Sequence, residues 1–97
     1  MRIRNKELLH KYVIRHANVR SALQHWIDIV EKAEWESFNE LKMDFPSVDY
    51  VGNGRYVFNI KGNDHRLIVI ILFAERYLNV RYIGTHAEYD KIDCKTV

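Results

Sequence analysis

The chain has 97 residues, of which 47% are hydrophobic and 29% are charged, and its formal net charge is +2. A chain of this length has room for one hydrophobic core, so we predict a single domain over residues 1–97. The composition excludes a disordered chain, and the longest apolar run, residues 67–74, is shorter than the roughly 18 residues of a membrane helix.

The first third of the chain is predicted to be helical after a short edge strand at residues 1–4. Apolar residues recur at helical spacing over residues 6–16, and Asn5 is the expected N-cap. Asn18 is expected to cap a second helix with one apolar side. That side consists of Val19, Ala22, Leu23, Trp26, Ile29, Val30 and Ala33.

A third, short helix is predicted from a capping-box pattern. Ser37 is followed three residues later by Glu40, which is the spacing at which two side chains cap the backbone reciprocally. Pro46 ends this helix because proline cannot continue it. Its expected buried side chains are Phe38, Leu41 and Phe45.

From residue 48 onward the apolar pattern alternates, as it does in β-strands. Asn53-Gly54 supplies the positive φ angles of a tight turn, so residues 48–51 and 55–61 are predicted to form a hairpin. Residues 66–73 are predicted to form a central strand that is covered on both faces. The expected outward face of 55–61 carries Arg55, Val57, Asn59 and Lys61, opposite Tyr56, Phe58 and Ile60. In the last strand we expect Leu78, Val80 and Tyr82 on one face and Asn79, Arg81 and Ile83 on the other.

Helices followed by an antiparallel meander predict an α+β fold. We expect the N-terminal helices to pack on one face of a small antiparallel sheet. The other face then collects three cations and an amide, which are Arg55, Asn59, Lys61 and Arg81.

Metal, nucleotide and acyl chemistry find no support in the motifs. The five histidines fit neither HExxH nor a Cys/His zinc spacing, so we predict no metal and no cofactor. There is no phosphate-binding loop and no nucleophile elbow.

Acid–base chemistry remains, and the pattern fits metal-free cleavage of RNA. Such cleavage needs a base for the 2′-hydroxyl, cations for the phosphorane and an acid for the leaving oxygen. His86 and Tyr89 would share a face if residues 85–93 are helical, and histidine commonly exchanges a proton near neutral pH. Lys61 and Arg66 flank a turn and could both contact a phosphate.

Each of these residues also has a purely structural interpretation. His86 could cap a terminal helix, and Tyr89 could pack on the sheet with its hydroxyl in water. Lys61 and Arg66 could be solvated hairpin ends, and Arg81 could pair with Glu75. Taken singly, the structural interpretation is favoured for each residue, because perturbed functional groups are a minority of surface charges.

The N-terminal segment and the cysteine content bear on location. MRIRNKELLHKY has no apolar stretch of the kind found in signal peptides. One cysteine, Cys94, excludes an internal disulfide and agrees with a reducing compartment. We therefore predict a cytoplasmic protein that does not associate with a membrane.

Three segments carry a family resemblance. VGNGRYVF (51–58), FNIKGNDHRLIV (58–69) and RYIGTHAEYDKID (81–93) together resemble the HigB-type toxins of bacterial toxin–antitoxin pairs. The resemblance extends through the helical stretch that ends in KAEWES and so covers essentially the whole chain.

This resemblance implies a compact toxin fold of the RelE/ParE superfamily and a metal-independent mRNA interferase. Such an endoribonuclease cuts translated messenger RNA at the ribosome, transfers the scissile phosphate to the 2′-hydroxyl and inhibits translation. The implied partner is an antitoxin of the HigA type with a helix-turn-helix domain. The complex would repress its own operon, so that operator DNA is contacted only through the antitoxin.

The resemblance also implies roles for individual residues. The expected catalytic residues, which stabilise the transition-state phosphate or exchange a proton, are Lys61, Arg66, His86 and Tyr89. Asp90 is expected to position the proton-transferring group, and Arg81 to hold a neighbouring phosphate. The full set expected to contact RNA is Arg55, Asn59, Asn63, Arg81, Asp90 and Lys91.

Two other functions stay open. ParE-like relatives share the fold but poison DNA gyrase, and fold alone does not determine function. A catalytically degenerate toxin could also persist as an antitoxin-binding module. Joint presence of His86 and Tyr89 with Lys61 and Arg66 favours the nuclease, because a gyrase poison does not need them.

Overall fold

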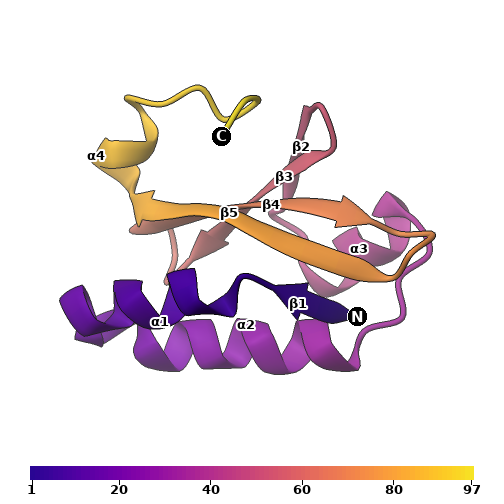
Figure 1. Cartoon of the computed structure of the whole chain (residues 1–97), viewed down its shortest axis with the longest axis horizontal. Helices are drawn as coiled ribbons and strands as arrows, with labels where there is room; N and C mark the ends of the chain where they lie inside the picture. Colours follow the sequence, from indigo (N-terminus) through magenta and orange to yellow (C-terminus); the bar gives the residue numbers. More distant parts are fainter.

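The computed structural model describes all 97 residues, and a five-stranded sheet lies at its centre (Figure 1). The fold is therefore α+β, as predicted. None of its helices has the length and apolar character needed to cross a membrane. The elements in chain order are β1 (Arg2–Arg4), α1 (Lys6–Arg15), a 3-10 helix η1 (Ala17–Val19), α2 (Arg20–Lys32), α3 (Phe38–Asp44), β2 (Asp49–Gly52), β3 (Arg55–Ile60), β4 (His65–Leu72), β5 (Tyr77–Thr85) and α4 (His86–Tyr89).

The sheet is mixed and not purely antiparallel, which corrects the prediction. Its strand order is β1-β5-β4-β3-β2. Strands β2 to β5 form an antiparallel meander, whereas β1 runs parallel to β5, with Ile3 opposite Leu78. Parallel neighbours need a long connection, and all the elements between β1 and β5 provide it here. The predicted edge position of β1 is confirmed.

Nineteen buried side chains, drawn from α1 to α3, the segments that connect them and one face of the sheet, form one hydrophobic core. Leu23, Trp26 and Val30 of α2 are buried as predicted, and Ile27 is buried as well. The ring of Trp26 meets that of Phe58 edge to face, with centroids 5.4 Å apart. Buried aromatic pairs of this kind contribute strongly to core stability, so this contact joins α2 to β3.

Of the three predicted N-caps, Asn5 and Ser37 occupy the N-cap position, and Asn18 does not. Asn5 precedes α1, but its φ is 69° and its side-chain amide donates to the Val80 carbonyl oxygen at 2.9 Å. It therefore ties the start of α1 to β5. Asn18 lies within η1, so it is not the residue that begins α2. Ser37 does cap α3, because its hydroxyl accepts a hydrogen bond from the Glu40 N–H at 3.3 Å.

The β2–β3 hairpin forms at the predicted turn, and a β-bulge in β5 is new. Asn53 and Gly54 have the positive φ angles that such a turn requires, 52° and 74°. In β5, adjacent β4 residues pair with Tyr82 and Val80 and skip Arg81. The extra residue shifts the alternation by one position.

The bulge corrects the predicted faces of the last strand. Ile83 joins Val80 in the core, while Tyr82 lies on the opposite face. The prediction had placed these two side chains the other way round. Strict alternation failed here because it assumes that every residue of β5 has a partner in β4.

His65 is the one buried polar or charged residue, at 4% exposure. Its Nδ1 and the Tyr12 hydroxyl share a hydrogen bond of 2.6 Å, which joins β4 to α1. The ring of His16 stacks on Tyr12 at 4.2 Å. Burial lowers the pKa of His65 from its ordinary value, and the nearby His16 lowers it further. The neutral form of His65 is therefore the one that the fold favours.

This burial predicts how stability depends on pH. Because the pKa of His65 is lower in the folded chain than in the unfolded chain, the unfolded chain takes up the proton first on acidification. The free energy of unfolding should therefore fall as pH drops below about 6.5, by at most about 1.4 kcal/mol per pH unit for one proton. His65→Asn should reduce this slope in urea titrations between pH 7 and pH 5. An unchanged slope would show that His65 is not the group responsible.

Candidate functional site

The face of the sheet opposite the helix core carries several of the predicted site residues. Since Tyr56, Phe58 and Ile60 enter the core, the alternate residues of β3 point to the other side. Asn59 pairs directly with Arg66 of β4. Figure 1 shows α4 and the C-terminal segment on this side, away from α1 and α2. We call this surface the cationic face, defined by Arg55, Asn59, Arg66, Arg81 and Tyr89.

Its floor is apolar and closed to water. Val57 and Ile68 pair across β3 and β4, and they are 5% and 0% exposed although neither belongs to the helix-side core. Helix α4 packs against β4 and β5. Charged groups above such a floor interact more strongly than they would in open water, because fewer water molecules screen them.

Arg66 and Tyr89 meet at the centre of the predicted site. The Arg66 guanidinium carbon lies 5.7 Å from the centroid of the Tyr89 ring, and an Arg66 amine donates to the Asn63 carbonyl oxygen at 3.1 Å. Burial and the neighbouring Cys94 thiol raise the pKa of Tyr89 to about 12, while Arg66 acts in the opposite direction. The Tyr89 hydroxyl therefore keeps its proton at neutral pH and can donate it.

Helix α4 places His86 next to Asp90, one turn further on. Thr85 and Glu88 form a full capping box, so α4 begins at His86 and the capping residue is Thr85. The His86 Nε2 lies 3.7 Å from an Asp90 carboxylate oxygen, and both side chains are more than half exposed. The His86 backbone N–H donates to the Asp64 carbonyl oxygen at 3.1 Å, which ties α4 to the β3–β4 turn.

Lys61 differs from these residues in its backbone conformation. It is the first residue of the β3–β4 turn, with a φ of 54°, so the alternation of β3 no longer directs its side chain. It lines a hollow of about 160 Å³ beside Ala22 and His25 of α2, together with Asn59. Its side chain is exposed and makes no hydrogen bond or ion pair, and the expected contact of both Lys61 and Arg66 with one phosphate stays a prediction.

Arg55 and Arg81 converge on one oxygen atom. Two Arg55 nitrogens donate to the Val97 main-chain oxygen at 3.1 and 2.8 Å, and the Arg81 Nε donates to the same atom at 3.2 Å. The bulge in β5 gives Arg81 the reach to do this. Arg81 thus pairs with Val97 and not with Glu75, its predicted structural alternative.

The remaining predicted contacts, Asn63 and Lys91, are exposed at the rim of the cationic face. Asn63 contributes through its main-chain oxygen, which holds Arg66. Lys91 follows α4, and its backbone N–H donates to the Glu88 carbonyl oxygen at 3.1 Å. Neither of these two side chains contacts the Arg66–Tyr89 pair through a hydrogen bond.

Sequence reasoning missed three residues at this site. Cys94, which the sequence analysis used only to exclude an internal disulfide, lies close to Tyr89. Tyr82 lies over Gly84, where an added Cβ would come within 2.4 Å of the Tyr82 hydroxyl oxygen. Gly84 thus leaves room for the Tyr82 ring. Gly84 pairs with Arg66 of β4, so this ring lies next to Arg66. The sequence does contain a glycine at position 84, which could have indicated a close approach of another side chain. The bulge that brings Tyr82 over Gly84 has no sequence signature.

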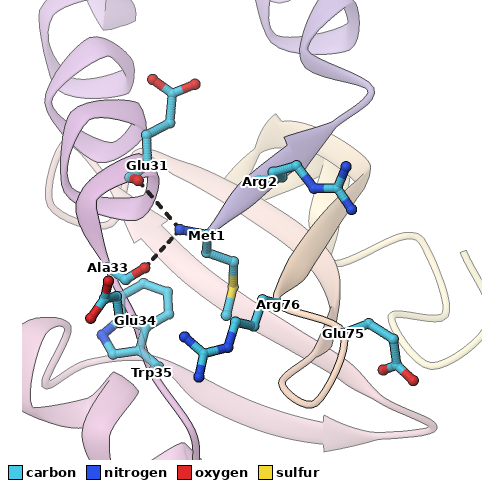
Figure 2. A pocket seen from close by; sticks show the side chains of 8 residues that line it. All are labelled: Met1, Arg2, Glu31, Ala33, Glu34, Trp35, Glu75 and Arg76. Carbon is cyan, nitrogen blue, oxygen red and sulfur yellow. Dashed lines mark hydrogen bonds between the residues drawn. The ribbon is translucent and has the colours of Figure 1, made fainter.

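A separate pocket of about 420 Å³ lies at the other end of β5 (Figure 2). The Met1 amino group lies in it and donates to the main-chain oxygens of Glu31 and Ala33, at 3.3 and 2.7 Å. This pocket contains none of the predicted site residues. No three histidine, cysteine, aspartate or glutamate side chains are grouped so that they could hold a metal ion.

Comparison with known proteins points to one family. The sequence model of HigB_toxin, described as the RelE-like toxic component of a toxin-antitoxin system, matches residues 19–92. The mRNA interferase HigB of Escherichia coli O6:H1 is 29% identical over 94 residues, which cover 95% of this chain and 91% of that protein. The mRNA interferase toxin HigB of Escherichia coli K12 is 34% identical over 64 residues, or 63% of this chain and 61% of that protein. All ten predicted site residues lie within the range that the family model matches.

Proposed function

The chain belongs to the HigB family of RelE-like toxic components of toxin–antitoxin systems, and from this premise we propose that it is an endoribonuclease that cleaves messenger RNA. The relatives named mRNA interferase support this activity. The observation that supports this activity at the level of individual residues is the Arg66–Tyr89 pair, in which a cation lies beside a phenol that keeps its proton.

The proposed reaction is an attack of the RNA 2′-oxygen on the adjacent phosphorus. A base removes the 2′-hydroxyl proton, the bond from phosphorus to the 5′-oxygen breaks, and an acid protonates that oxygen. The products are a 2′,3′-cyclic phosphate and a free 5′-hydroxyl. No metal takes part in this proposal, because protein cations can stabilise the charge on the phosphorane.

The roles follow from the placement of the side chains. Arg66 stabilises the phosphorane, since a guanidinium can donate two parallel hydrogen bonds to phosphate oxygens. Tyr89 is the acid, because its pKa of about 12 keeps it protonated at neutral pH. His86 is the base, and Asp90 orients it from 3.7 Å. The Lys61 side chain is exposed and makes no hydrogen bond or ion pair, so it is free to contact an incoming phosphate as a point charge.

The RNA-binding surface extends from this centre along the cationic face. Asn59, next to Arg66, and the exposed Asn63 and Lys91 contact the RNA or the ribosome in this proposal. Arg55 and Arg81 lie further along the same face. Acting on translated messages, the toxin would work in the cytoplasm and on the ribosome. Its partner would be a HigA-type antitoxin with a helix-turn-helix domain, which would bring the complex to operator DNA.

Mapping of cleavage sites tests both the activity and its dependence on the ribosome. The toxin is expressed briefly in a bacterium, and new 5′ ends are mapped on two copies of one reporter message, of which one lacks its start codon. Cuts should appear only in the translated copy and should disappear with Lys61→Ala or His86→Ala. Equal cutting of both copies would contradict ribosome dependence. Growth arrest without cuts would contradict the nuclease and favour a gyrase poison, which a supercoiling assay would detect.

A further inference from the structure

The C-terminal segment, residues 90–97, crosses the cationic face instead of leaving it open. In Figure 1 it runs back from α4 above the sheet toward the β2–β3 hairpin. The Asn53 side-chain amide donates to the Lys95 carbonyl oxygen at 3.1 Å, and Arg55 and Arg81 hold the Val97 oxygen. The end of this segment therefore lies on two of the face's arginines.

The contact with Val97 has the geometry of an anion site. Three N–H groups from two guanidinium groups point at one oxygen, at 2.8 to 3.2 Å. Neither arginine has an Asp or Glu carboxylate within ion-pair distance. Converging guanidinium groups are the usual protein ligands of phosphate, because their N–H groups form a planar fork that matches two phosphate oxygens.

The position of Arg55 and Arg81 relative to Arg66 indicates which phosphate of an RNA strand they could hold. Arg55 and Asn59 lie on the same face of β3, four residues apart, which corresponds to about 13 Å along an extended strand. Asn59 is paired with Arg66. Arg55 thus lies at a different position along the sheet from Arg66, so a phosphate between Arg55 and Arg81 can be a second phosphate of the RNA strand that Arg66 contacts.

We propose that Arg55 and Arg81 form a phosphate subsite for the RNA strand beside the cleavage site, and that residues 95–97 are an internal ligand that RNA must displace. The identity of the anion as RNA rests on the proposed function, whereas the anion site and its internal ligand do not. Bound RNA and the docked segment exclude one another at this position.

The contacts that hold the segment suit a displaceable ligand. Lys95 and Thr96 are exposed, and Val97 is only half-buried. The segment's own hydrogen bonds are local, from Lys95 N–H to an Asp93 carboxylate oxygen at 3.0 Å and from Thr96 N–H to the Asp93 carbonyl oxygen at 3.2 Å. Water can replace such exposed hydrogen bonds at small net cost, so a polyanion can compete with them.

Two variant proteins test the contact between the Val97 oxygen and the two arginines. A chain that stops after Lys95 loses the Val97 oxygen but keeps Cys94 beside Tyr89. The matched control carries Thr96→Ala and Val97→Ala, which changes both side chains and keeps the main-chain oxygen. Inorganic phosphate is the first probe, and its binding is measured by NMR of the Arg55 and Arg81 Nε–H groups. A short 2′-O-methyl RNA, which cannot be cut, is the second, measured by fluorescence anisotropy.

The shortened chain should bind both probes about tenfold more tightly than the full chain, because one charge-assisted contact is no longer occupied. The control should bind like the full chain. Arg55→Lys in the shortened chain should reduce phosphate binding, since lysine lacks the planar fork.

Three results would separate the parts of this inference. Equal phosphate affinity of the shortened and full chains would overturn the internal ligand. Phosphate binding that leaves the Arg55 and Arg81 resonances unmoved would overturn the subsite. If the shortened chain gains phosphate affinity but no form of the protein cuts RNA, the proposed nuclease fails while the anion site and its internal ligand stand.

Discussion

Arg66→Ala is expected to lower the rate of RNA cleavage by about 10²- to 10³-fold, the usual cost of removing one group that stabilises a transition-state charge. The guanidinium lies beside Tyr89 and is held by the Asn63 carbonyl oxygen, so it is already oriented before RNA binds. The measurement is a single-turnover cleavage rate with purified toxin, ribosomes and a defined message.

Two controls make this result interpretable. Arg66→Lys keeps the charge but loses the planar fork, so its cleavage rate should lie between those of the parent and of Arg66→Ala. Thermal unfolding should show little change for either variant, because half-exposed surface substitutions commonly alter stability by less than about 0.5 kcal/mol. A folded Arg66→Ala protein with the parent's cleavage rate would remove Arg66 from the mechanism.

Tyr89→Phe is expected to lower the cleavage rate by about 10²- to 10⁴-fold, the range assigned to a general acid or base. The substitution removes only the hydroxyl and leaves the ring beside Arg66, so RNA binding should change little. The matched control is Tyr77→Phe, which removes the same atom from a tyrosine that also lies near an arginine, with the Arg4 guanidinium carbon 4.2 Å from its ring centroid. Tyr77→Phe should cleave like the parent.

The pH profile distinguishes the two roles that Tyr89 could have. With a pKa of about 12, Tyr89 stays protonated between pH 6 and pH 9, so an acid role adds no pH dependence in this range. A base role requires the ionised form, and the rate due to it would rise about tenfold per pH unit. We therefore expect the parent and Tyr77→Phe to show no tenfold rise per unit over this range. Such a rise, lost in Tyr89→Phe, would assign Tyr89 as the base.

Local patterns predicted the elements that local chemistry determines. The apolar side of α2 placed Leu23, Trp26 and Val30 in the core, because residues three and four apart share a helix face. Asn53-Gly54 marked the hairpin, since few other residue pairs adopt its positive φ angles. The segments around residues 58–69 and 81–93 were also specific enough to indicate the family that the comparisons show.

Predictions failed where a distant partner competes for a group. Asn18 is a good N-cap residue by type, yet it lies within η1, and the Asn5 amide at the N-cap position of α1 binds the Val80 carbonyl oxygen instead of capping the helix. The parallel pairing of β1 with β5 depends on contacts between residues more than seventy positions apart. Local propensity carries no information about such contacts, because the competing partner is brought close only by the fold.

For the candidate site, the sequence by itself determined the residue types and their family, and the tertiary structure decided which of them meet. Arg66 and Tyr89 come together because α4 packs against β4, whereas Lys61 lies in the β3–β4 turn with a positive φ. The bulge at Arg81 lets this residue share an oxygen with Arg55. Alternation along a strand is a local rule, but bulges, turns and the docking of the C-terminal segment depend on what the whole chain packs against.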